Sequence, residues 1–97
     1  MTYEIVFAPH AVQDYKQLSA RDRSMVHDAL ERHLRHAPER TSRSSIKRLR
    51  GLSQPQYRLR VGDIRIFYDV VGRSVQILAI IAKPDARAWL EEAGKVK

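Results

Sequence analysis

The chain has no cysteine among its 97 residues, and it contains one tryptophan, four glycines and four prolines. Without cysteine there is no disulfide framework and no thiolate site for a metal ion, as is common in a reducing compartment. No apolar run approaches the ~20 residues that a membrane-spanning helix needs. The first residues also lack the basic segment and apolar core of a secretory signal. We therefore expect a soluble, cytoplasmic protein with no membrane partner.

Acidic residues are scarce in one third of the chain. Between Arg40 and Arg73 lie nine lysines and arginines but only two acids, whereas the rest has nine basic and nine acidic residues. The net charge of +7 is therefore concentrated in this stretch. Such a concentration is typical of a surface that binds a polyanion, and nucleic acid is the commonest polyanion that a small domain meets. The alternative is a solvated basic face that only aids solubility.

Length and hydrophobic periodicity predict one α+β domain over residues 1–97. The β-prone segment Tyr3–Phe7 precedes two patterns of helical spacing, the second beginning at Ser19 and ending before Pro38. Three predicted strands follow, and a last helical pattern begins near Pro84 and stops at Gly94. We expect the order β-α-α-β-β-β-α, with an N-terminal helical hairpin, a mostly antiparallel four-stranded sheet and a C-terminal helix. The helices are predicted to share one face of the sheet and to leave the other face open.

The most informative segment is Tyr57–Val70, in which apolar and polar residues alternate on both sides of a Gly-Asp pair. This pattern predicts a β-hairpin with a two-residue turn, where glycine supplies the positive φ. If Val61 lies opposite Ile64, the apolar residues of both strands share one face. The opposite face then contains Arg58, Arg60, Arg65 and Phe67.

This register places Arg60 directly across from Arg65. Like charges at opposite positions of two strands destabilise a sheet by some tenths of a kcal/mol up to about 1 kcal/mol. A bound anion would relieve the repulsion, so the arginines of this face predict a phosphate site. The alternative is that each arginine extends into water or pairs with a carboxylate of the chain, namely Asp63, Asp69 or Glu91.

A longer pattern runs through Ala11–Leu18, Lys47–Gly51 and Tyr57–Tyr68, in which Leu-Arg-Gly precedes Tyr-Arg-Leu-Arg-Val-Gly-Asp. It resembles the RelE/ParE toxin superfamily of bacterial and archaeal toxin–antitoxin modules, over nearly the whole chain. The resemblance implies a RelE-like fold and an antitoxin partner that holds the protein inactive. RelE-type members are RNA endonucleases that enter the ribosome and cut messenger RNA, whereas ParE-type members inhibit DNA gyrase.

The resemblance also implies roles for individual residues. In RelE-like nucleases three cations of the hairpin surround the scissile phosphate while the 2′-hydroxyl attacks the phosphorus, and these positions are Arg58, Arg60 and Arg65 here. The family often has a further arginine after the last strand and a tyrosine or histidine near the C-terminus, where this chain has Lys83 and Trp89. Lys83 is the candidate for the missing cation, and for the base if burial beside the arginines favours its neutral form. Otherwise it is an ordinary lysine at the end of a strand.

Other residues complete the predicted site. His33 and His36 lack an acidic ligand at zinc-site spacing, and no glycine-rich phosphate loop is present, so we expect no metal and no cofactor. His33 belongs to the helical stripe that should face the core, and Trp89 falls on the apolar stripe of the last helix. The residues expected to bind the RNA backbone are Lys47, Arg48, Arg50 and Arg87.

Three interpretations follow. The first is a metal-independent endoribonuclease toxin, an mRNA interferase that inhibits translation by cutting messenger RNA, in association with the ribosome. The second is a ParE-like inhibitor of DNA gyrase that cuts nothing, which the missing C-terminal acid–base group favours. The third is a weakened family member that only binds its antitoxin or RNA.

Overall fold

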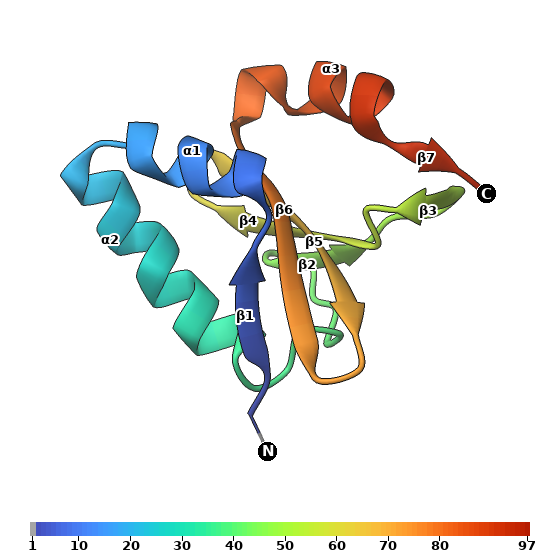
Figure 1. Cartoon of the computed structure of the whole chain (residues 1–97), viewed down its shortest axis with the longest axis horizontal. Helices are drawn as coiled ribbons and strands as arrows, with labels where there is room; N and C mark the ends of the chain where they lie inside the picture. Colours follow the sequence, from blue (N-terminus) through green and yellow to red (C-terminus); the bar gives the residue numbers. More distant parts are fainter. Residues whose placement is uncertain (1) are drawn as a thin grey trace.

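The computed structural model describes residues 2–97 as an α+β fold (Figure 1). The main sheet has five strands in the order β1-β6-β5-β4-β2, antiparallel except for the parallel pair of β1 and β6. Two further strands, β3 and β7, form a separate antiparallel ribbon. In residues 2–97 no helix has the length and apolar character required to cross a bilayer. The elements are β1 (Glu4–Phe7), α1 (Pro9–Gln17), α2 (Ala20–Ala29), the π-helical turn η1 (Leu30–Leu34), β2 (Ile46–Arg48), β3 (Leu52–Gln54), β4 (Tyr57–Val61), β5 (Ile64–Val71), β6 (Ser74–Ala82), α3 (Lys83–Ala93) and β7 (Lys95–Val96).

The predicted order of helices and long strands is confirmed, but the sheet has five strands instead of four. The additional strand is β2, which pairs with β4 so that Ile46 lies opposite Leu59. Both residues are buried in the core. A strand of three residues is too short to show an alternation in the sequence, and for that reason the four-stranded prediction was wrong in this detail.

The predicted register of the hairpin is confirmed. Val61 lies opposite Ile64, and the other residue pairs of β4 and β5 have the register that this pair fixes. The apolar side chains of this hairpin face α1 and α2 and form one core with them. Figure 1 shows both helices beside the sheet. The core residues of these helices and η1 are Ala11, Val26, Leu30 and Leu34.

The opposite face of the sheet is not open, contrary to our expectation. Helix α3 packs on it, and the Trp89 ring stacks on Phe67 with 4.8 Å between ring centroids. Phe67 is 2% exposed as a result. The helix is held at both ends, because the Lys83 backbone N–H donates to the Asp63 carbonyl at 2.7 Å and β7 pairs with β3 just beyond its C-terminus. Trp89 is therefore a packing residue, as its position on an apolar stripe predicts.

Helix α2 continues into a π-helical turn. In η1 the Arg35 backbone N–H donates to the Leu30 carbonyl at 3.0 Å, five residues earlier. The buried residues Val26, Leu30 and Leu34 recur every four positions. Four residues of an α-helix exceed one full turn by about 40°, so a continuous α-helix would move each of these side chains further around the helix axis. The wider turn keeps them on one face. His33 consequently lies half-buried at the flank of this stripe, and its prediction as a core-facing residue was wrong.

Candidate nucleic-acid interface

Strand alternation gathers three arginines on the α3 side of the sheet. Arg58 and Arg60 are two residues apart on β4, and Arg65 on β5 lies directly opposite Arg60. On the outer side of β4, Lys47 lies opposite Arg58. The structure thus contains two pairs of like charges at opposite strand positions, each of which destabilises the empty sheet. We call Arg58, Arg60 and Arg65 the clamp arginines.

Arg58 is the most strained of the three in electrostatic terms. Burial lowers the pKa of its guanidinium, and the charges of Arg65 and Arg60 lower it further. Its Nε atom is buried and has no hydrogen-bond partner within residues 2–97. An arginine remains protonated at neutral pH, so Arg58 presents a partly desolvated positive charge with an unused donor. An anionic oxygen bound by the rest of the guanidinium would neutralise the charge.

Arg65 is bound more closely to the protein than the sequence suggests. It is only 8% exposed. Its Nη1 atom donates to the carbonyl of Gly62 at 2.9 Å and to that of Ile64 at 3.0 Å. The side chain therefore braces the hairpin turn, and its charge acts on Arg58 from within the sheet.

The carboxylates considered as partners do not neutralise the clamp arginines. Asp69 is buried on the same face, but its two oxygens accept hydrogen bonds from the Gln56 backbone N–H at 2.8 Å and from Gln54 Nε2 at 2.7 Å. It fixes the segment between β3 and β4. None of the clamp arginines forms an ion pair with a carboxylate of residues 2–97. The repulsion within the cluster is left without an internal counter-charge.

The predicted RNA-binding residues of β2 and its C-terminal end lie beside the clamp. Lys47, Arg48 and Arg50 line an open groove of about 560 Å³ together with Arg58 and Arg43. Arg48 is held in place, because its Nη1 atom donates to the Gln56 carbonyl at 3.0 Å and its guanidinium lies 5.0 Å from the centre of the Tyr57 ring. Arg43, in the exposed loop before β2, extends the same cationic run.

The residues predicted on α3 are less closely joined to the clamp. Lys83 is the first residue of α3 and is exposed, so the burial required for its role as a base is absent. Its backbone contact with Asp63 nevertheless places it beside the hairpin turn. Arg87 is exposed on α3. The predicted cations that line this one groove are Lys47, Arg48, Arg50 and Arg58. Lys83 and Arg87 are not among its lining residues.

Solved structures share this architecture, although no protein-family model and no curated protein matches the chain. A double mutant of the toxin RelE from E. coli, in the free state, has a TM-score of 0.70 and 23% identity, covering 96% of this chain and 95% of that one. The RelBE2 toxin–antitoxin complex from Mycobacterium tuberculosis has a TM-score of 0.69 and 24% identity, and the match covers 84% of this chain and 99% of that one. The RelB–RelE complex from Methanococcus jannaschii has a TM-score of 0.67 and 21% identity, and the match covers 87% of this chain and 96% of that one. The chain has the RelE fold.

In this RelE-fold protein the hairpin tyrosines lie on the wrong side of the sheet to serve the clamp. Tyr57 and Tyr68 stack in the core with 5.4 Å between ring centroids. Burial raises the pKa of both hydroxyls. The Tyr68 hydroxyl donates to the Pro38 carbonyl at 2.6 Å, and this bond fixes the chain after η1. Neither tyrosine is placed to exchange a proton with a ligand at the clamp.

Proposed function

We propose that this RelE-fold chain is the toxin of a type II toxin–antitoxin module and that it cleaves messenger RNA in association with the ribosome. The observation that supports this most strongly is the cluster of clamp arginines, which no carboxylate of residues 2–97 neutralises and in which Arg58 has a buried, unused donor. A backbone phosphate of RNA supplies the missing negative charge.

The proposed reaction is an attack by the ribose 2′-hydroxyl on the adjacent phosphorus. The bond between O2′ and phosphorus forms while the bond to O5′ breaks, which leaves a cyclic phosphate on one fragment. Solvent water accepts the proton of the 2′-hydroxyl and supplies a proton to O5′, so the other fragment ends in a 5′-hydroxyl. Negative charge accumulates on the phosphoryl oxygens in the transition state. In this mechanism Arg58 and Arg60, both on β4, stabilise that charge, and Arg65 braces the turn between β4 and β5. Because the Arg58 guanidinium is already partly desolvated, it needs less reorganisation for this step.

The same proposal includes an antitoxin partner. The M. tuberculosis and M. jannaschii neighbours are complexes of a toxin with its antitoxin. The net charge of +7 makes an acidic segment of such a partner complementary to the basic stretch of this chain. An antitoxin segment at the clamp would supply the counter-charge that the sheet lacks, and it would thereby exclude RNA.

A second candidate function is inhibition of DNA gyrase without cleavage. It is favoured by the exposed position of Lys83, the one residue predicted as the base. The burial of the two hairpin tyrosines also removes their hydroxyls as proton acceptors at the clamp. In this alternative the cationic surface binds a protein or DNA and performs no chemistry.

The two functions are separated by adding the purified protein to a translation extract and, in parallel, to a gyrase supercoiling assay. We expect codon-phased cleavage of the message and no loss of supercoiling. Arg58→Ala should slow cleavage by about 10²-fold or more, the scale of losing one donor to a developing oxyanion. Arg21→Ala, an exposed arginine at the start of α2, is the control and should cleave normally. Loss of supercoiling with an intact message would contradict the proposal.

A further inference from the structure

Three adjoining hollows surround the edge of the sheet formed by β2. The first is the groove beside Lys47 and Arg58, and it shares Thr41, Ser42 and Ile46 with the second. The second shares Arg32 and His33 with the third, which ends at Arg60. The hollows therefore form one track that leaves the clamp at Arg58, passes around β2 and returns to it at Arg60. We call its middle part the edge groove, with Arg32, His33, Arg40, Thr41 and Ser45 as lining residues.

The edge groove exists because of two local features of the backbone. The π-helical turn places Arg32 and His33 beside the buried stripe instead of within it. Across the groove, the loop before β2 is fixed by the Ser42 side chain, whose hydroxyl oxygen accepts a hydrogen bond from the Ser45 backbone N–H at 3.1 Å. The Ser42 backbone N–H also donates to the Ile46 carbonyl at 2.9 Å. Both walls of the groove are thus built before any ligand arrives.

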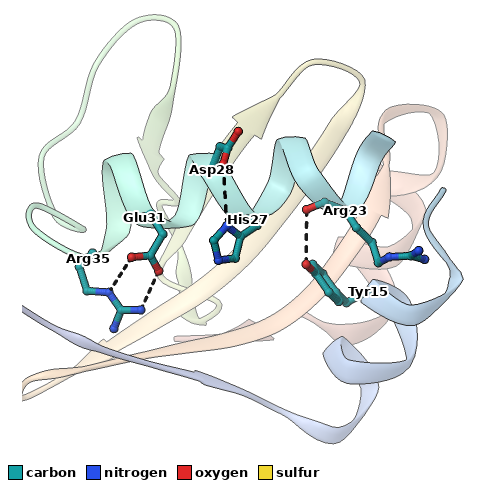
Figure 2. A network of polar contacts seen from close by, with 6 residues as sticks. All are labelled: Tyr15, Arg23, His27, Asp28, Glu31 and Arg35. Carbon is teal, nitrogen blue, oxygen red and sulfur yellow. Dashed lines mark hydrogen bonds and ion pairs between the residues drawn. The ribbon is translucent and has the colours of Figure 1, made fainter. Parts of the chain in front are cut away.

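Neighbouring acids leave the groove with an excess of positive charge. The Glu31 carboxylate is bound by Arg35 at 2.7 Å on another side of the helix, as Figure 2 shows. Glu39 is exposed in the loop after η1, and after burial its charge is the next cause that raises the pKa of the Tyr57 hydroxyl. Asp28 is the one carboxylate among the lining residues of the third hollow, and it also lies 3.8 Å from His27. The second and third hollows contain three guanidinium groups, those of Arg32, Arg40 and Arg60, so positive charge outnumbers this one carboxylate.

We infer that the edge groove binds the phosphate backbone of RNA that continues beyond the clamp. This inference rests on the proposed RNA-cleaving function and extends its binding surface to Arg32 and Arg40, which the sequence analysis did not assign to RNA. A continuous cationic track with hydroxyl donors suits a chain of regularly spaced phosphates. Thr41 and Ser45 supply those hydroxyls within the groove. Both ends of the track are clamp arginines, Arg58 and Arg60. An RNA strand bound along the track therefore has its scissile phosphate at the clamp.

The test compares two double variants of the full-length chain that lose the same charge. Arg32→Ser with Arg40→Ser alters the edge groove, and both side chains are exposed. Lys16→Ser with Arg21→Ser removes two exposed cations that line neither the groove nor the clamp. The probe is a single-stranded 2′-O-methyl oligoribonucleotide, in which the attacking hydroxyl is blocked. Its affinity is measured between 50 and 200 mM salt, and thermal unfolding verifies that each variant is folded.

We expect the groove variant to bind the oligonucleotide about 10- to 30-fold more weakly at 100 mM salt than the unmodified protein. The slope of log affinity against log salt should become shallower by about 1.4, because each phosphate contact of a single strand contributes about 0.7. The control variant should keep the original slope. Cleavage by the control variant at saturating message should change by less than about twofold, since neither Lys16 nor Arg21 lines the groove or the clamp.

A second arm separates the two possible sources of the RNA. Unchanged oligonucleotide binding together with lost co-sedimentation with ribosomes would assign the groove to ribosomal RNA, and weaker oligonucleotide binding would assign it to the message. Only weaker oligonucleotide binding supports the inference, because ribosomal RNA is not the strand that continues from the clamp. Unchanged behaviour in both arms overturns it, as does a selective loss of binding to an acidic peptide, which would assign the groove to a protein partner. If the unmodified protein binds the oligonucleotide with the expected slope but cuts no message, the proposed function fails and the groove inference stands.

Discussion

At the scale of single residues, Arg58 shows how a binding site can be built at the expense of stability. Its guanidinium lies partly buried beside two other arginines, and its Nε atom has no acceptor within residues 2–97. The residue lies opposite Lys47 as well. The proposed phosphate site would account for this arrangement, because a bound anion offsets the repulsion.

We predict that Arg58→Met stabilises the free protein while it weakens RNA binding. The substitution removes the repulsion across the strands and keeps most of the apolar side chain, so the gain should be about 0.5–1 kcal/mol. For a domain of this size, a gain of 1 kcal/mol raises Tm by about 4–8 °C. Circular dichroism at low salt measures the shift. An equal or lower Tm would show that the cluster is not strained.

Arg65 should behave in the opposite way, because it braces the hairpin turn. Arg65→Lys removes the planar guanidinium that donates to two carbonyls, and we expect a loss of about 1–2 kcal/mol in the free energy of unfolding. The matched control is Arg60→Lys on the exposed side of the pair, which should change stability by less than about 0.5 kcal/mol. Urea unfolding compares the two variants. Equal losses would refute a special role for Arg65 in the turn.

At the scale of elements, the sequence was most informative where the pattern is local. The alternation around Gly62-Asp63 was enough to predict the register of β4 and β5 and hence the face shared by the clamp arginines. The strands of the ribbon have two or three residues each and show no period, so they could not be predicted. Nor could the hydrogen bonds of Arg65, because backbone carbonyls are the same at every position.

The prediction that α3 shares one face of the sheet with the other helices was wrong for a related reason. The apolar stripe of α3 is short, and no residue of the helix is fully buried. The decisive contact is the stack of Trp89 on Phe67, two residues far apart in sequence. Phe67 shares a face with the arginines, so that face was interpreted as a solvent-exposed surface, although it has an apolar end that α3 covers.

Trp89→Ala should therefore loosen α3 without unfolding the sheet. We expect a loss of about 2 kcal/mol from the lost stack and buried area, less than for a fully buried tryptophan. Hydrogen exchange should accelerate for the backbone amides of α3 and β7, and those of β5 and β6 should keep their protection. Arg87→Ala, on the exposed part of the same helix, is the control. A uniform acceleration over the whole chain would contradict this view of α3.

At the scale of the whole molecule, the fold gathers the charge of Arg40–Arg73 around one edge of the sheet. Strands β2, β4 and β5 all come from this stretch, and they are adjacent in the sheet. A charge segregation that is visible in the sequence thus becomes a single cationic surface in space. The helices on the core side supply Arg32 to the same surface, which only the structure shows.

The central claim is that the clamp arginines stabilise a phosphate of messenger RNA during attack by the 2′-hydroxyl. The most direct test determines the chemical ends of message fragments from a translation extract supplied with the protein. We predict fragments with 5′-hydroxyl ends, which require phosphorylation before ligation, and their loss with Arg58→Ala. Fragments with 5′-phosphate ends, or an intact message with normal translation, would contradict the account.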